Sequence, residues 1–147
     1  MSRLLCLALL IACSAVIGSN AEKSSTTLYV QLVRATNEEK PKEADWKPIG
    51  PKLSKRISPV FRWKNYWEVA RHTLTVETGK VTRVRLNAEQ ELEIDRIADD
   101  RLEIRLYRNG KLARKSLESA QQKMSIMGGH AGDNEAWFVV VRREKPQ

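Results

Sequence analysis

The chain has 147 residues and a formal net charge of +8, with 26 lysines and arginines against 18 aspartates and glutamates. Its two cysteines, Cys6 and Cys13, both lie within the first 21 residues. If these first 21 residues are removed, the remaining chain contains no cysteine, so it can form no disulfide and no reactive thiol site. The positive balance favours contact with polyanions, although a basic surface also serves solubility alone.

Residues 1–21 predict a cleavable secretory signal peptide. Arg3 provides a basic start, about 15 mostly apolar residues follow, and small residues precede Glu22. The apolar run is shorter than the roughly 20 residues that cross a bilayer, so we expect no transmembrane span after processing. Residues 10–13 resemble a bacterial lipobox, which leaves a lipid anchor at Cys13 as the alternative. We therefore expect an exported protein, periplasmic or extracellular.

After a polar leader at residues 22–26, the sequence predicts a single β-rich domain over residues 27–143. The first strand is expected at 27–34, where Leu28, Val30 and Leu32 alternate with polar residues. Residues 35–59 hold four prolines and many charges, which predict a long connection without a central strand. We expect this connection to lie against the domain surface.

Further alternating segments predict antiparallel strands joined by short turns. Residues 69–77 and 81–86 are interpreted as a hairpin that turns at Thr78-Gly79. A strand around Leu92 and Ile94 precedes a turn at 99–100 and a strand at 101–107. Asn109-Gly110 suits a type I′ turn, because both residues tolerate positive φ, and residues 111–117 return.

The C-terminal third combines one ambiguous segment with one clear strand. Residues 116–127 fit either a helix face or a strand, and we favour the strand; residues 128–134 are expected to form a glycine-rich loop. The continuously apolar run at 136–141 predicts a central strand covered on both faces, and residues 144–147 should fray. About eight strands without βαβ alternation predict an all-β, mainly antiparallel fold, a small β-sandwich or partly open barrel.

Aromatic and basic side chains interleave between residues 61 and 67, with further basic residues upstream. Aromatic rings stack on the apolar faces of sugars or bases, and cations pair with carboxylates or phosphates, so the pattern suits a binding face. In the alternative interpretation, the rings plug the open end of the sandwich and the cations are merely solvated. The predicted binding residues are Trp46, Lys52, Lys55, Arg56, Arg62, Trp63, Lys64, Tyr66 and Trp67.

Metal and catalytic constellations are weak in this sequence. His130, Asp133 and Glu135 offer three ligands on a glycine-rich loop, where a polar hairpin loop is the plainer interpretation. Met124 and Met127 suit core filling better than copper binding. His72 lies within a strand, and Glu91, Glu93 and Asp95 are expected to form one solvated strand face. We expect no cofactor, no metal site and no enzymatic activity.

Three segments, Gly50-Pro51-Lys52-Leu53-Ser54-Lys55, Phe61-x-Trp63-Lys64-x-Tyr66-Trp67-Glu68 and Trp137-Phe138-Val139-Val140-Val141, together resemble a group of small, uncharacterised secreted bacterial proteins. The resemblance covers most of the mature chain and implies bacterial export, but no activity or site residue.

The sequence thus favours a non-enzymatic cell-envelope module that binds a partner protein or an anionic envelope component, polysaccharide or lipid headgroup. Export makes nucleic acid the least favoured partner. One alternative is a structural subunit of an envelope assembly, joined by strand addition to an open sheet edge. A metal- or carboxylate-dependent hydrolase is a further, less favoured alternative.

Overall fold

The computed structural model describes residues 23–130 and 132–147. The predicted signal peptide, its cleavage site and the lipobox cysteine Cys13 lie outside these residues. Among the described residues, no helix has the length and apolar character needed to cross a membrane.

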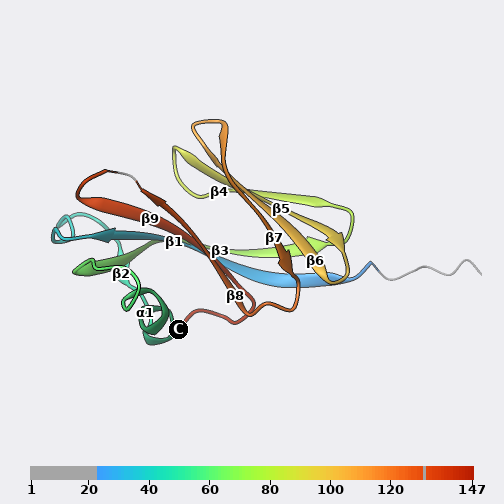
Figure 1. Ribbon diagram of the computed structural model, residues 1–147, viewed down its shortest axis with the longest axis horizontal. Helices are drawn as coiled ribbons and strands as arrows, with labels where there is room; N and C mark the ends of the chain where they lie inside the picture. The colour runs from blue at the N-terminus through green and yellow to red at the C-terminus, as the bar shows by residue number, and fades with distance from the viewer. Residues whose placement is uncertain (1–22, 131) are drawn as a thin grey trace, which may run out of the picture.

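The described chain folds into two antiparallel sheets packed face to face, which is the small all-β sandwich that the strand pattern predicts (Figure 1). Neither sheet closes into a barrel. The first sheet, in the order β2-β3-β1-β9-β8, contains β1 (Ser25–Thr36), β2 (Lys47–Pro48), β3 (Asn65–Glu77), β8 (Met124–His130) and β9 (Glu135–Arg142). The second sheet, in the order β4-β5-β6-β7, contains β4 (Val81–Arg85), β5 (Gln90–Ala98), β6 (Arg101–Arg108) and β7 (Lys111–Ser119).

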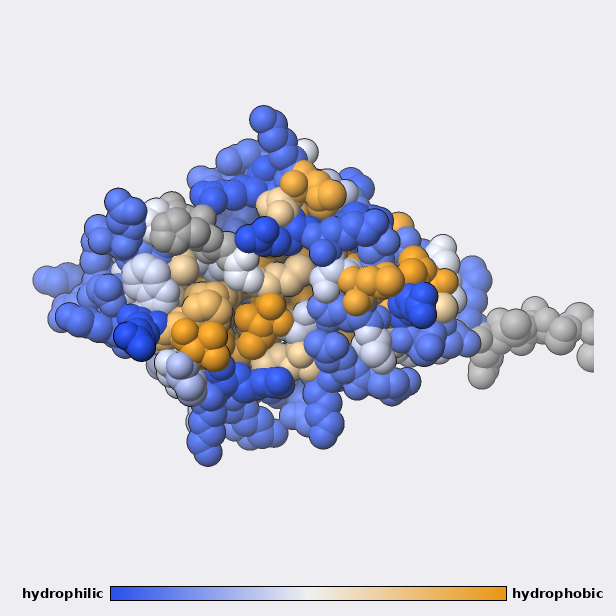
Figure 2. Space-filling view, in the orientation of Figure 1, coloured by the Kyte–Doolittle hydropathy of each residue, from blue (hydrophilic) through white to orange (hydrophobic). Residues whose placement is uncertain are grey.

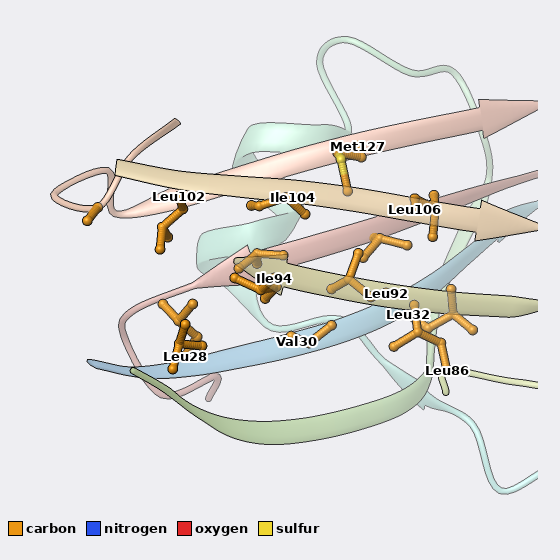
Figure 3. Packing of buried hydrophobic residues seen from close by; sticks show 14 residues of the cluster. Leu28, Val30, Leu32, Leu86, Leu92, Ile94, Leu102, Ile104, Leu106 and Met127 are labelled. Atoms are coloured by element: carbon orange, nitrogen blue, oxygen red, sulfur yellow. The ribbon is translucent and has the colours of Figure 1, made fainter. Parts of the chain in front are cut away.

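The main core lies between the two sheets and consists of the alternating aliphatic residues of facing strands (Figure 3). Leu28, Val30 and Leu32 of β1 point toward Leu92 and Ile94 of β5, and all five side chains are buried. Because successive residues of a strand point to opposite faces, this alternation sets the inner face of each strand. The predicted inward faces of the first strand and of the strand around Leu92 are confirmed.

A second core covers the opposite, outer face of the first sheet. Val33 and Ala35 of β1 and Phe138 of β9 are buried there, beneath Leu53 and Ile57 of a short helix, α1 (Pro51–Ile57). Leu53 and Ile57 are four residues apart, so they share one face of the helix. Phe61, just after the helix, packs its ring on that of Phe138 with centroids 4.6 Å apart.

The proline-rich connection at residues 35–59 is therefore more structured than the sequence predicts. Its first two residues complete β1, residues 47–48 form β2, and residues 51–57 form α1. Pro51 stands at the first helical turn, where its missing N–H costs nothing, and the extended Gly50 precedes it. The expectation that this segment lies against the domain is confirmed, but the helix within it was missed.

The predicted hairpin at Thr78-Gly79 is wrong. β3 belongs to the first sheet and β4 to the second, so this turn carries the chain from one sheet to the other. Gly79 adopts a positive φ of 75° and its N–H donates to the carbonyl oxygen of Arg96. A local sequence pattern cannot distinguish a crossover between sheets from a hairpin, because both need two strands and a tight turn. The Asn109-Gly110 turn, with φ of 49° and 76°, does join paired strands as predicted.

Two expectations for the C-terminal region also need correction. β8 extends to His130, into the predicted glycine-rich loop, because Gly128 and Gly129 pair with Phe138 and Trp137 of β9. The last residues pack against the domain: Pro146 is buried, and its carbonyl oxygen accepts a hydrogen bond of 3.3 Å from Arg71. Residues 116–119 end β7 and residues 124–127 begin β8, so the strand interpretation of residues 116–127 holds except for the turn at 120–123, and the doubly covered strand at 136–141 is confirmed.

Replacement of Leu53 by alanine should lower the free energy of unfolding by about 3 kcal/mol, because it opens a cavity between α1 and the first sheet. The matched control is Leu112→Ala, whose side chain is 53% exposed, and it should change stability by less than about 0.5 kcal/mol. Urea unfolding followed by circular dichroism measures both. Equal effects of the two substitutions would contradict the second core.

Candidate functional site

The structure divides the predicted binding residues between the two faces of the first sheet. The register of β3 against β1 shifts near Val69, so that Tyr66 stands opposite Ala35 on the outer face and Trp67 stands opposite Arg34 on the inner face. An extra residue in one strand reverses which face the following side chains occupy. Neighbouring aromatic residues in the sequence therefore serve different surfaces.

On the outer face, Trp63 and Tyr66 are half-buried and pack against the second core. The Tyr66 hydroxyl donates to the carbonyl oxygen of Phe61, and the backbone N–H of Trp63 donates to the Tyr66 hydroxyl at 3.3 Å. These contacts make the two rings part of the fold, although they cover the outer face rather than the open end of the sandwich.

A shallow groove of about 420 Å³ runs between α1 and the start of β3. Its lining combines aromatic side chains with two hydroxyls from the helix side and one cation. The groove is lined by Pro48, Ile49, Ser54, Ser58, Trp63, Lys64, Asn65, Tyr66 and Trp67. Four of the predicted binding residues thus line one surface feature, among them Trp67, whose side chain lies on the inner face of the sheet.

The segment that forms this groove is rich in positive charge. Residues 47–64 contain six lysines and arginines and no aspartate or glutamate. We call these six exposed side chains the basic face: Lys47, Lys52, Lys55, Arg56, Arg62 and Lys64. Lys52 pairs with Glu144 at 3.2 Å, and its hydrogen bond and charge hold the pKa of Glu144 below the usual value. Within the described chain the other five form no ion pair.

On the inner face, the remaining predicted residue, Trp46, joins side chains that the sequence reasoning missed. The guanidinium of Arg34 lies 5.0 Å from the ring centroid of Trp46 and 5.8 Å from that of Trp137, and it pairs with Glu135. Cations over indole faces are favourable contacts. The sequence did contain a signal for this cluster. Arg34 continues the inward alternation of Leu28, Val30 and Leu32, so its charge lies on the core side of β1.

The outer face of the second sheet carries a network of ion pairs centred on Glu93. Glu93 accepts hydrogen bonds from Arg83, from Arg105 at 3.0 Å and from the Tyr107 hydroxyl at 3.3 Å. Its side chain is buried, which corrects the expectation of a solvated acidic strand face at this position. Burial raises the pKa of Glu93, but the hydrogen bond from Arg105 and the charges of Arg83 and Arg105 outweigh it and lower that pKa overall. A carboxyl held ionised in this way is unsuited to act as a general acid.

Potential metal ligands do not gather in the described residues: no group of three or more histidine, cysteine, aspartate or glutamate side chains is placed to hold an ion. Met124 and Met127 pair with Arg142 and Val139 and so point to opposite faces of β8, each toward a hydrophobic core. The side chain of His130 lies outside the part of the chain that the structure describes.

No protein-family model, curated protein or solved structure matches this chain. The class of the protein is therefore defined by its own architecture, a small antiparallel β-sandwich with a helix-covered outer face.

The ion-pair network predicts loss of stability in acid. The folded-state pKa of Glu93 lies below the ordinary value of 4.5, so its contribution is present above that pH and is lost as the pH falls through the lowered pKa. Glu93→Gln should cost about 2 kcal/mol at about pH 7, and the difference from the unaltered protein should shrink toward about pH 3. Urea unfolding at each pH measures it.

Asp95→Asn is the matched control, since Asp95 lies two residues further along the same face of β5 and forms no ion pair in the described chain. It should leave stability nearly unchanged at both pH values. A constant deficit of Glu93→Gln across the pH range would show that the ionised carboxylate is not what stabilises the sheet.

Proposed function

We propose that this protein is a non-enzymatic, exported module of the cell envelope that binds an anionic surface, acidic polysaccharide or lipid headgroups, through the basic face. The observation that carries the proposal is the 18-residue stretch from 47 to 64, which has six cations, no acid and one ion pair. The predicted signal peptide supports export, and the basic face supports the class of ligand.

The separation of charge on the molecule strengthens this proposal. Several cations of the second sheet are paired with carboxylates: Arg83 and Arg105 with Glu93, and Lys115 with Glu103 at 3.1 Å. Cations used for folding are thus neutralised locally. Five of the six cations of the basic face form no such pair in the described chain, so its potential extends into solvent and attracts anions.

The groove beside α1 adds contact area to this attraction. Trp63 and Tyr66 are held by the second core, so their exposed edges present rigid aromatic surface without further loss of side-chain freedom on binding. The Ser54 and Ser58 hydroxyls, 3.3 Å apart, lie on the helix side of the groove and can donate to anionic oxygens. An acidic partner protein would meet the same features.

The double substitution Lys55→Gln/Arg56→Gln tests the proposal. Each basic residue near an anionic surface contributes about 1 kcal/mol, so the variant should lose about 2 kcal/mol, roughly thirtyfold in affinity. Binding is measured by sedimentation with phosphatidylcholine vesicles, with and without phosphatidylglycerol, and by titration with alginate as a polyuronate. Raising the salt from about 0.1 M to about 1 M should weaken binding, since the Debye length falls from about 10 Å to about 3 Å.

The matched control is Arg101→Gln/Lys111→Gln, which removes the same charge from exposed positions on the second sheet. It should retain most of the affinity. An equal loss in both variants would mean that binding follows net charge rather than the basic face. If the protein bound neither phosphatidylglycerol vesicles nor alginate, the proposal would be overturned and a protein partner would be favoured.

Strand addition is a second candidate, supported by the edge strand β8. Residues 124–129 of β8 carry no charge, whereas natural edge strands are usually protected by lysines, prolines or bulges. Figure 2 shows apolar side chains gathered on the face where β7 and β8 lie. Size-exclusion chromatography at about 1 M salt separates the candidates, because assembly through paired strands persists where charge contacts are screened.

A further inference from the structure

We infer that the open end of the sandwich is a second binding site, separate from the basic face, which takes a sugar ring with an acidic substituent stacked on Trp137. At this end the two sheets diverge, with the β4–β5 loop and the β6–β7 turn standing away from β9 (Figure 1). Two adjoining hollows of about 200 and 430 Å³ occupy the space between the sheets, and both are lined by Gln90, Arg108 and Trp137.

One wall of the site is an aromatic platform held rigid from behind. Trp137 is half-buried and packs against the main core, and Arg34 of the neighbouring strand lies against its ring. The Trp137 indole Nε1 donates to Glu135 at 3.4 Å. The register places Gly129 of β8 opposite Trp137, a position that offers no side chain to cover the ring. The platform is therefore in place before a ligand arrives, which lowers the entropic cost of binding.

The opposite wall is polar. Gln90 is buried, and its amide orientation is set by a 3.0 Å hydrogen bond from Asn87 Nδ2 to its Oε1. Its Nε2 donates to no other described residue. Arg108 pairs loosely with Glu89 at 3.5 Å and keeps further donors available. A fixed amide and a guanidinium facing an aromatic ring match the hydroxyls on the edge of a sugar.

This asymmetry distinguishes a sugar from other ligands. A nucleobase or an apolar ligand is best enclosed by a pocket lined mainly by hydrophobic and aromatic side chains. A pyranose presents a C–H face, which packs on the negative face of an aromatic ring, and a rim of hydroxyls that need partners. The cleft has one aromatic wall and one polar wall, with Leu106 and Ala113 as the apolar lining of the smaller hollow. The larger hollow also contains the carboxylates of Glu89 and Glu135, which pair with Arg108 and Arg34, so the acidic substituent is placed in the smaller hollow.

The position of Arg114 indicates that the sugar carries an acidic substituent. This exposed side chain of β7 reaches across to β8, where its Nε donates to the Gly128 carbonyl oxygen at 3.4 Å, and it lines the smaller hollow beside Trp137. Its terminal nitrogens pair with no carboxylate in the described chain. Together with Arg108 it places two guanidinium groups at one side of the platform, the geometry that suits a carboxylate.

The four tryptophans give a direct test, because each indole N–H produces its own signal in a ¹H–¹⁵N spectrum. The purified protein is titrated with trigalacturonic acid and with its fully methyl-esterified form, which keeps the rings and removes the charge. The Trp137 signal should shift with both ligands, and the acid should bind about tenfold more tightly, the effect of one charge-assisted contact. The Trp63 signal, beside the basic face, should move less.

Arg114→Gln should abolish the preference for the acid and leave binding of the ester unchanged. Arg101→Gln, at the far end of β6, is the matched control and should keep the preference. Absence of any Trp137 shift overturns the site, and a shift confined to Trp63 would place the sugar on the basic face and do the same. Equal affinity for acid and ester would overturn the role of Arg114. None of these outcomes depends on whether the basic face binds phosphatidylglycerol.

Discussion

The whole structure depends on the burial of β1 on both faces. From Leu28 to Thr36 nearly every side chain of this strand is buried, including the polar Gln31. A strand of this kind cannot face solvent, so the first sheet needs a cover on each side. The second sheet covers the inner face, whereas α1, the segment that follows it and the C-terminal tail cover the outer face. The position of the basic face follows from this requirement, because α1 packs over Val33, Ala35 and Phe138 and carries part of that face.

The outer cover also explains a buried polar cluster beneath the tail. Glu68 accepts a hydrogen bond from Gln31 and two from Arg71, at 2.8 and 2.9 Å, and Arg71 also binds the carbonyl oxygen of Pro146. Buried charges are tolerated where they are paired and hydrogen-bonded. The cluster thereby fixes the end of the chain against β3. It accounts for a tail that stays packed despite its charged composition.

Function, as proposed, uses the surfaces that folding leaves unpaired. Carboxylates neutralise Arg83, Arg105 and Lys115 on the second sheet, and Glu135 neutralises Arg34 at the open end. Five of the six cations of the basic face have no such partner in the described chain, and neither has Arg114 beside Trp137. The two surfaces lie on opposite sides of the first sheet and differ in chemistry, one broad and cationic, the other a cleft with a single aromatic wall. A module with both could hold an acidic polymer by its charge and by one of its rings.

Local pattern in the sequence determined the strands, their inward faces, the Asn109-Gly110 turn and the all-β class, because alternation and turn chemistry act over a few residues. It also marked residues 61–67 as a concentration of rings and cations. Only the tertiary structure decided how these residues divide. The extra residue near Val69 reverses the facing of Tyr66 and Trp67, and the pairing of β9 with β1 brings Trp137 to Arg34. Bulges and long-range pairing depend on contacts between distant segments, so no short stretch of the chain contains the information that specifies them.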